Sequence, residues 1–479
     1  MEEKKKPVLT NTLINTLAFS NGLNTMAQNI PQLFLAMFMT DYLGINPVAM
    51  ASGMFIARIF DFIVGLVAGI IIEQSHFKHG KYLSWIRLLT VTLFFGNIIQ
   101  MLDTTAFVKN ATLRLIIVMA GYMTYHPSMN FYSASRGSMI PRLAGADMEL
   151  RKKITSRQSQ FGSAVAIIGN AVTLPLVTMM GRITGKESMG YFLAALLFSG
   201  AFVVMNLTFC RMAAPFDPPE QAGGPARKIP TVGQMVKSVV TNRQMVILFL
   251  CYTTFTIGNQ LYTGVTTYFF KVTGNYDQYT FWLTARSVCA FLATLAAPAI
   301  GRKLGKKNAL ITGWTIVALA SFAMKFLAFA DGRANIPVMG VCMCLKNAAM
   351  YLYMSFNANY YLDCGEYGYF TTGVDNRTMA VTVMNWPSKI GFAFGGSLVG
   401  LAIAWAGYQA PAGGGVGAFA SMDRFMTVIG LIPGLLALAG AVGIALFFKL
   451  TDAQAAMYAR ANLEREQAAA EAETNGSEN

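Results

Sequence analysis

The sequence predicts an all-α integral membrane protein whose twelve transmembrane helices form two six-helix bundles. Charged residues make up only 13% of the 479 residues and hydrophobic residues 54%, whereas a soluble domain carries roughly 25% charged residues. Apolar segments of about 20 residues, the length that crosses a bilayer, recur along the chain. The basic residues gather in alternate connections between these segments. This composition excludes a disordered chain, a disulfide-rich secreted scaffold and an ordinary soluble enzyme.

Each half of the chain supplies six of the predicted spans. In the first half they cover residues 12–39, 47–72, 83–105, 112–134, 156–180 and 190–213. In the second half they cover residues 242–270, 278–300, 308–330, 336–362, 378–407 and 424–449. Residues 213–230 are rich in proline and glycine, which predicts a solvated linker because proline fixes φ and removes a hydrogen-bond donor. The predicted division is an N-terminal bundle, a cytoplasmic linker, a C-terminal bundle and a cytoplasmic tail, at 1–212, 213–240, 241–450 and 451–479.

Basic residues predict the orientation, because cytoplasmic loops carry an excess of lysine and arginine. One set of alternate loops is strongly basic, with its positive charges within residues 4–6, 78–81, 142–153, 227–228 and 302–307. The other set holds scattered cations such as Lys109 and Lys271. Both termini are therefore predicted to be cytoplasmic, in a multi-pass protein of the cytoplasmic (inner) membrane. Two six-helix halves around a central linker form the plan of the major facilitator fold, whose halves rock around a midplane cavity.

The overall charge and the cysteines indicate no further partner or cofactor. The formal net charge of +14 lies chiefly in the predicted cytoplasmic turns, so it does not require a nucleic-acid partner. Cys342 and Cys344 are two residues apart, so on a helix they point in different directions and cannot share a metal ion. The sequence shows no phosphate-binding G-x-x-x-x-G-K-[ST] loop and no catalytic triad. We expect no enzyme activity, no cofactor, no metal and no ATP-driven pump, and a monomer in the lipid bilayer.

Ionisable residues inside the predicted spans are costly and mark functional sites. Arg58 and Asp61 are three residues apart, on one face of the second span. They form either an internal ion pair or a coupling site in which the carboxylate faces a cavity and takes a cation or a proton. Lys389 follows Trp386 and a proline, and a bent helix is tolerated best beside a cavity. Lys389 is thus a candidate partner for Asp61 or for a substrate oxygen, although a purely structural pair is the alternative.

Polar and aromatic residues concentrate in the seventh and tenth spans. Lipid-facing packing needs only apolar side chains, so this polarity indicates a wet cavity. Sugar sites use aromatic faces and amide groups, which makes several of these residues candidates for substrate binding. From this part of the chain the predicted substrate-binding residues are Tyr262, Tyr353, Asn357, Trp386 and Lys389.

Several sequence runs, in order, resemble one family. These are TDYLG (40–44), ARIFD (57–61), HGKYLSWI (79–86), RGSMIPRL (136–143), and DCGEYGYFTTGVDNR (363–377) followed by SKIGFAFGG (388–396). The set is similar to the glycoside–pentoside–hexuronide:cation symporters of the major facilitator superfamily, the melibiose permease-like proteins. The resemblance implies a secondary active transporter, a symporter that carries a sugar or glycoside across the membrane by alternating access.

The chain departs from the family at the cation site. In the family, the aspartate that matches Asp61 is followed three and four positions later by a polar residue and a second aspartate, which together ligate Na⁺. Here Val64 and Gly65 occupy those positions, and their side chains supply no oxygen ligand. One carboxylate can still take a proton, so we expect coupling to H⁺ rather than Na⁺, or uniport.

The family's sugar-binding carboxylates also look absent. The matching positions fall near Thr25 in the first span and near Ser133 in the fourth. Arg136 stands where the family usually has an aromatic residue, and Arg157 lies near the position of the family's arginine in the fifth span. Because arginine binds carboxylates bidentately, these residues suggest an anionic glycoside such as a hexuronide. The alternative is that Arg136 extends toward the phosphates of the cytoplasmic surface.

Charged residues at cytoplasmic helix ends hold the outward-facing state in the family. Charge pairs that form in one state and break in the other make a transporter bistable. The residues predicted to form such a gate here are His79, Lys81, Arg151, Asp363, Glu366 and Arg377. The alternative is that they belong to simple surface hairpins.

Two further questions stay open at this level. The basic turns HFKHGKY (76–82) and GRKLGKKN (301–308) occupy equivalent places in the two halves, which indicates either an internal repeat or only their common topology. The alternatives to a sugar symporter are a uniporter, a carrier of a non-sugar small molecule, and a transport-inactive membrane sensor.

Overall fold

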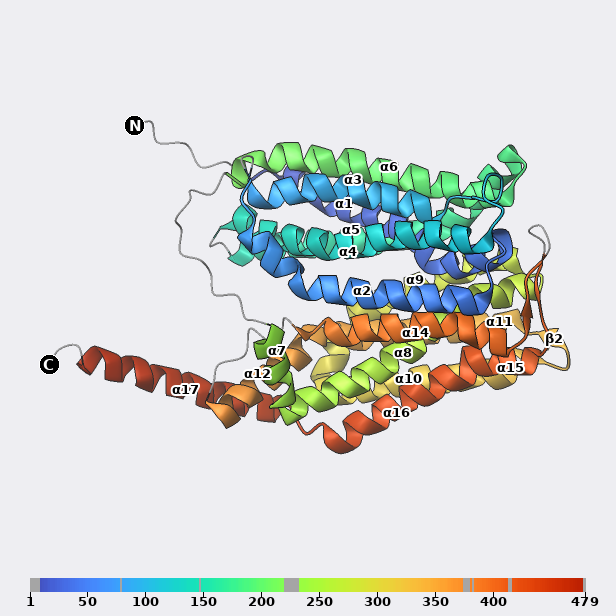
Figure 1. Ribbon diagram of the computed structural model, residues 1–479. Helices are drawn as coiled ribbons and strands as arrows, with labels where there is room; N and C mark the ends of the chain where they lie inside the picture. The colour runs from blue at the N-terminus through green and yellow to red at the C-terminus, as the bar shows by residue number, and fades with distance from the viewer. Residues whose placement is uncertain are drawn as a thin grey trace. The chain divides into compact units, whose positions relative to one another are not determined.

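The computed structural model describes residues 9–77, 80–145, 148–218, 232–373, 380, 383–411 and 416–476, and these residues are almost entirely helical (Figure 1). The predicted all-α fold class is confirmed. The elements of the first half are α1 (Asn11–Met37), η1 (Phe38–Tyr42), α2 (Pro47–Gln74), α3 (Lys81–Gln100), α4 (Ala111–Ala144), α5 (Met148–Thr184), α6 (Glu187–Ala213) and η2 (Ala214–Phe216). The α-helices α1 to α6 coincide with the first six predicted spans.

The second half continues with longer and shorter helices. They are α7 (Val232–Val240), α8 (Arg243–Val272), α9 (Tyr276–Leu304), α10 (Lys306–Leu327), α11 (Ile336–Met354), α12 (Asn357–Thr372), α14 (Trp386–Trp405), α15 (Met422–Met426), η3 (Thr427–Leu431), α16 (Ile432–Phe447) and α17 (Asp452–Gly476). Two short antiparallel hairpins connect helices, β1 (Phe329–Ala330) with β2 (Arg333–Ala334) and β3 (Tyr408–Gln409) with β4 (Ala418–Phe419). The tenth predicted span, residues 336–362, covers α11 and the start of α12, which are separate helices. The helix α7 lies in the predicted linker.

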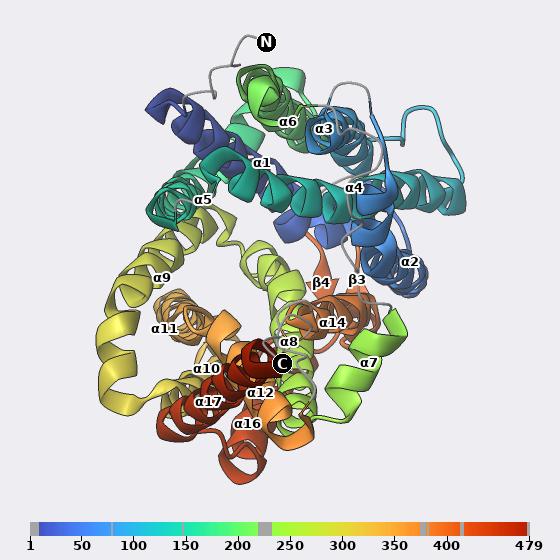
Figure 2. The ribbon, with the colours of Figure 1, turned by 90° about the vertical axis from the view of Figure 1, so that its left-hand side faces the viewer.

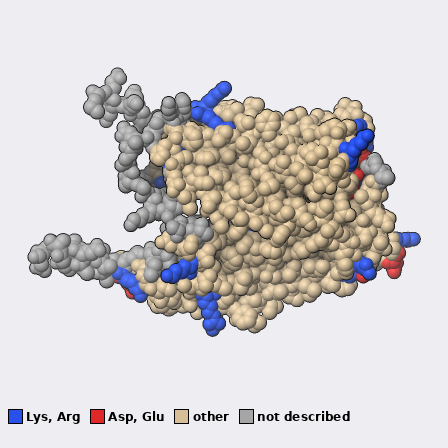
Figure 3. Space-filling model, viewed as in Figure 1, with Lys and Arg blue, Asp and Glu red and all other residues tan. Residues whose placement is uncertain are grey.

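Ten helical segments of the described chain are long and apolar enough to cross a bilayer. The helices α1 and α4 are not among them, although both coincide with predicted spans. The sequence of α1 is rich in asparagine and threonine, and that of α4 in tyrosine, serine and proline. On the face drawn in Figure 3, the charged side chains lie toward the helix ends and the surface between them is uncharged. This distribution is typical of helices that are surrounded by lipid.

Asparagine side chains fix the start of several helices. Asn46 accepts hydrogen bonds from Val48 N–H and Ala49 N–H, and Pro47 occupies the first position of α2. Asn110 caps α4 in the same way. A capping oxygen satisfies backbone donors that have no partner within the helix, and proline has no donor to lose at this position.

The chain divides into two compact units. Unit 1 comprises Met1–Arg227, Thr263–Ser287 and Gly396–Phe425, and unit 2 comprises Lys228–Tyr262, Val288–Gly395 and Met426–Asn479. The helices α8, α9 and α14 each place one end in unit 1 and the rest in unit 2. The units therefore do not follow the predicted boundaries at residues 212 and 241, and the division into sequence halves stays a prediction.

Unit 1 is built on close contact between α3 and α4. In this unit α3 also packs on α6, α1 packs on α5 and α6, and α2 packs on α4 (Figure 2). A methyl group on Gly96 would lie 2.8 Å from the backbone nitrogen of Tyr125, and one on Gly121 would lie 2.8 Å from that of Gln100. Only glycine allows the two backbones to approach this closely, as is common between membrane helices.

Unit 2 is built around α10, which packs on α11 and α16. Its core contains an aromatic cluster in which the rings of Phe255 and Trp314 stack with their centroids 4.8 Å apart. Tyr353 meets the edge of both rings. Stacked and edge-to-face rings contribute beyond the area that they bury, so this cluster holds α8, α10 and α11 together.

Candidate functional site

The predicted coupling residues Arg58 and Asp61 lie on α2 where it faces α4 in unit 1. Asn130 of α4 donates from Nδ2 to Asp61 Oδ1 at 2.7 Å and to the Asp61 carbonyl oxygen at 3.2 Å. Both predicted coupling residues are half-buried. Arg58 lies 5.9 Å from the centroid of the Tyr122 ring, a cation–π distance. The carboxylate thus combines partial exposure with a hydrogen bond from a neutral amide, and its role in coupling stays a prediction.

The run SKIGFAFGG contributes to the same region through its last glycine. A methyl group on Gly396 of α14 would overlap the Arg58 guanidinium. Glycine at this position therefore makes room for the arginine beside α14. The two earlier glycines, Gly391 and Gly395, act in unit 2, where a Cβ would overlap Thr256 and the Ile257 carbonyl of α8. The motif is explained by the close approach of α14 to these neighbours.

His126 of α4 lies in the region of Arg58 and Asp61 and was missed in the sequence analysis. Its ring stacks on Tyr122 with the centroids 3.9 Å apart, and it meets the Tyr125 ring edge to face. Tyr122, His126 and Asn130 follow one another at intervals of four residues, which places them on one face of α4. That spacing of polar residues in an apolar helix is the signal that could have revealed the site.

The other substrate candidates of unit 1 differ in their surroundings. Thr25 donates to the Asn21 carbonyl of its own helix at 3.1 Å, and Ser133 and Arg157 are exposed. Arg136 is only 6% exposed and donates to the Tyr132 hydroxyl and to the carbonyl of Leu17. Its guanidinium thereby joins α4 to α1. The assignment of these residues to substrate binding stays a prediction.

The candidates of unit 2 lie on α8, α11, α12 and α14. Tyr262 and Tyr353 are buried, and Tyr353 belongs to the aromatic cluster described above. Trp386 and Lys389 of α14 are half-buried, as is Asn357 at the start of α12. The structure places Tyr262 beside a lysine that the sequence analysis did not select, Lys346, whose Nζ lies 3.7 Å from the centroid of the Tyr262 ring.

The predicted gate residues of unit 1 lie at the ends of α3 and α5. Lys81 is the first residue of α3, is 5% exposed and lies 5.6 Å from the centroid of the Tyr82 ring. Arg151 donates from Nε to the carbonyl of Gly145 at 3.1 Å. His79 lies outside the described residues. The structure thus gives both described residues contacts at helix ends, and their role in gating stays a prediction.

The predicted gate residues of unit 2 contact α10 and α17. Asp363 of α12 pairs with Lys306 at 2.5 Å. Glu366 accepts a hydrogen bond from Asn462 of α17 at 2.7 Å. Arg377 lies outside the described residues. These contacts fasten α12 to two other helices of its unit, which is what a gate on this helix would have to release.

The two basic turns share their backbone geometry and their caps. Gly80 before α3 and Gly305 before α10 have φ of 89° and 76°, values that favour glycine. Leu83 N–H donates to Asp217 Oδ2 at 2.8 Å, and Lys306 N–H donates to Asp452 Oδ2 at 3.1 Å. Each aspartate follows the last helical segment of its half that is apolar enough to cross a bilayer. This correspondence favours the internal repeat over topology alone.

A buried ion pair joins distant segments within unit 1. Lys271, near the end of α8, lies 2.9 Å from Asp41 Oδ2 in η1, and the two side chains are 8% and 0% exposed. Tyr408 of β3 donates to Asp41 Oδ1 at 2.6 Å, and Thr40 donates to the same oxygen at 2.8 Å. One carboxylate therefore ties together three segments, from both halves of the sequence. In the sequence, TDYLG stood out only as part of a family motif, and Lys271 only as one of the scattered cations.

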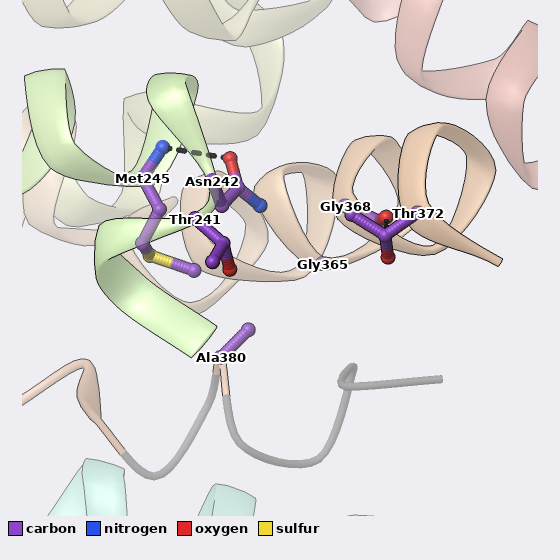
Figure 4. Close-up of a pocket in the computed structure, with 7 residues that line it drawn as sticks. All are labelled: Thr241, Asn242, Met245, Gly365, Gly368, Thr372 and Ala380. Carbon is purple, nitrogen blue, oxygen red and sulfur yellow. Dashed lines mark hydrogen bonds between the residues drawn. The ribbon is translucent and has the colours of Figure 1, made fainter. Parts of the chain in front are cut away.

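A small pocket in unit 2 lies where α12 approaches the start of α8. Asn242 accepts from Met245 N–H at 3.0 Å (Figure 4). It also donates to the Cys364 carbonyl at 2.6 Å. The pocket is lined by Thr241, Asn242, Met245, Gly365, Gly368, Thr372 and Ala380. A methyl group on Gly368 would lie 2.7 Å from Asn242 Nδ2. Gly368, the last residue of the run GEYG (365–368), thus makes room for the residue that caps α8.

Apolar helices with ionisable groups at depth, together with two matched half-sequences, define a secondary transporter of the major facilitator fold. The chain belongs to the family described as MFS/sugar transport protein, whose model matches residues 21–452. The predicted membership in the sugar:cation symporters of this superfamily is confirmed.

Named relatives agree with this class. The isoprimeverose transporter of Lactiplantibacillus pentosus is 25% identical over 400 residues, which cover 82% of this chain and 80% of that protein. The lactose permease of Lactobacillus helveticus is 23% identical over 364 residues, 72% of this chain and 54% of that protein. The crystal structure of a D-xylose-proton symporter has a TM-score of 0.67 at 13% identity and covers 91% of this chain and 98% of that one. This last similarity shows the shared fold.

Proposed function

We propose that this protein is an H⁺-coupled symporter that carries a glycoside across the cytoplasmic membrane by alternating access, with Asp61 as the carboxylate that takes the proton. Sugar transport in general follows from the family, and the identity of the coupling ion is what we add. The observation that carries it is the surroundings of Asp61. Its Oδ1 accepts from the Asn130 amide at 2.7 Å, while the next turn of α2 offers only Val64 and Gly65. A sodium ion needs several oxygen ligands, whereas a proton needs one.

Two of the relatives guide the proposed substrate class, although another relative is named as a sulfoquinovose importer. Proteins similar to this chain are named as transporters of isoprimeverose and lactose, both neutral glycosides. The predicted preference for a hexuronide depends on Arg136 and Arg157. Since Arg136 is occupied by the Tyr132 hydroxyl and the Leu17 carbonyl, we propose a glycoside whose recognition does not require an acidic group. Counterflow with isoprimeverose, lactose and a glucuronide, in parallel, compares the two classes.

The coupling ion is tested with the purified protein in liposomes. We expect accumulation of the exchanged glycoside to follow an imposed proton gradient and to be insensitive to Na⁺. Asp61→Asn should abolish accumulation and preserve exchange, because the neutral amide cannot carry a proton. Saturable stimulation by Na⁺ that disappears in Asp61→Asn would contradict H⁺ coupling. Accumulation by Asp61→Asn at the wild-type level would contradict the role of this residue.

A further inference from the structure

Lys346 is a lysine enclosed within unit 2. It lies in the middle of α11 and is 4% exposed. Its Nζ donates to the Ser321 hydroxyl of α10 at 2.7 Å and faces the Tyr262 ring of α8, whose centroid is 3.7 Å away. Three helices that are packed together thus meet at one amino group.

The partners of Lys346 are neutral. Among the described residues it forms no ion pair, and its contacts are one hydroxyl and one aromatic face. The titratable groups beside it are Tyr262 and, one turn earlier on its own helix, Cys342. On α10, Lys325 lies one turn beyond Ser321, and its Cβ is directed toward Gly430. No carboxylate in the described part of the chain therefore compensates a charge on this nitrogen.

These surroundings allow the amino group to exist in two protonation states. A charge inside the membrane is costly unless it is paired or hydrated, and lysine can release its proton where arginine cannot. The Tyr262 ring and the Ser321 hydroxyl give the ammonium partial compensation, through a cation–π contact and a hydrogen bond. The neutral amine can keep the hydrogen bond to Ser321 and loses only the attraction of the ring. Neither state is strongly excluded.

We propose that Lys346 is a second proton-exchanging residue of the transport cycle. A hydronium ion transfers its proton to the lone pair of the neutral amine, giving the ammonium and water, and the reverse transfer to water returns the neutral amine. The charge change alters the contact among α8, α10 and α11, so proton binding at Lys346 biases the packing of unit 2. This inference rests on the proposed H⁺-coupled function and adds a proton site to it.

The test compares energised and energy-independent transport in liposomes that contain the full chain. The probe is isoprimeverose, lactose or methyl glucuronide, whichever the wild type exchanges in counterflow. One proton per sugar at a membrane potential of about 100 mV supports accumulation of about 50-fold. We expect Lys346→Met, which is close in length and always neutral, to exchange sugar within about threefold of wild type but to accumulate little above equilibrium. Lys346→Arg, which is always charged, should also fail to accumulate. Lys325→Met is the matched control and should accumulate normally.

The outcomes separate the two proposals. If the wild type exchanges none of the probes or accumulates none with a proton gradient, the proposed function and this inference fall together. If the wild type accumulates sugar and Lys346→Met or Lys346→Arg accumulates equally, only the role of Lys346 is wrong. A further outcome is that Lys346→Met loses accumulation while Lys346→Arg accumulates fully. In that case only the positive charge is needed at this position, and proton exchange by Lys346 is excluded. If Lys346→Met cannot be purified, Lys346→Gln takes its place, and Lys346→Arg alone still decides.

Discussion

At the scale of single residues, the connection between α3 and α4 contains an aspartate with a perturbed pKa. Burial alone would raise the pKa of Asp103, but hydrogen bonds from Ser188 and Thr105 lower it below the usual value for an aspartate. Ser188 donates to Asp103 Oδ2 at 2.6 Å. The charged carboxylate therefore links this connection to the start of α6.

This link gives a pH-dependent prediction. A carboxylate whose pKa is lower in the folded state stabilises the protein above its unfolded-state pKa, and the contribution is lost as the pH falls through the folded-state value. Ser188→Ala removes one donor and brings the pKa of Asp103 closer to its usual range. We expect the variant to melt at a lower temperature than wild type near neutral pH, with the difference shrinking in acid. Melting curves of both proteins in detergent over a pH series measure this, and a difference that stays constant in acid would contradict it.

The sequence predicted some single residues and missed others for a physical reason. Asp61 and Arg58 were found because a charge inside an apolar span is costly, so few ionisable residues occur there. His126 was missed because it sits among other aromatic residues of its helix. Asp217 was missed because it lies in a segment that reads as a linker, although it is 1% exposed in the structure. The role of Asp217 as a cap depends on neighbours in the folded structure that the sequence does not show.

At the scale of elements, the two equivalent helix starts differ in how deeply their caps are buried. Asp217 is fully enclosed, caps α3 through Leu83 and pairs with Arg142 at 2.9 Å. Asp452 caps α10 but is 46% exposed, with Lys306 Nζ 3.5 Å away. A buried pair that loses one partner leaves an uncompensated charge, whereas an exposed pair is screened by water.

The matched variants Asp217→Ala and Asp452→Ala each remove a capping carboxylate. Comparing their losses of stability therefore shows how much burial of the cap contributes. We expect Asp217→Ala to cost about 2–4 kcal/mol, from the lost cap and the lost ion pair with Arg142. Asp452→Ala should cost about 1 kcal/mol or less. Asp217→Asn should fall between them, since an amide oxygen can still cap α3. Stability against denaturant in detergent gives the order, and equal losses in the two alanine variants would refute the argument from burial.

At the scale of the whole molecule, composition and loop charge were enough to predict the fold class. Ten segments of the described chain have the length and apolarity of a span, against the twelve spans predicted. Composition and loop charge could not predict the break between α11 and α12 at Ser355 and Phe356, because no proline or glycine marks it. They also could not predict that parts of α8, α9 and α14 pack with the first half of the chain in unit 1. Which ends of the helices are in contact depends on the conformation of the transporter, and one sequence encodes every conformation of the cycle.

The ion pair between Asp41 and Lys271 provides the test of that conformational dependence. It binds segments from both halves of the sequence, so a state in which these segments separate has to break it. Lys271→Met leaves Asp41 buried without its cation, which favours separation. Each 1.4 kcal/mol of lost differential stability shifts such an equilibrium about tenfold. Thr267, which is inaccessible and donates to the Leu33 carbonyl at 2.9 Å, reports on the same contact.

A cysteine at Thr267, in a background without the native cysteines, makes this shift measurable. We expect a membrane-impermeant maleimide to label Thr267→Cys slowly with the ion pair intact, and about tenfold or more faster with Lys271→Met. Adding Asp41→Asn to Lys271→Met should slow the labelling again, because it removes the unpaired buried charge. Lys109→Met, which changes a cation in a connection without an ion pair among the described residues, is the control. Equal labelling rates with and without Lys271 would mean that the pair holds the local fold and has no part in opening this end of the transporter.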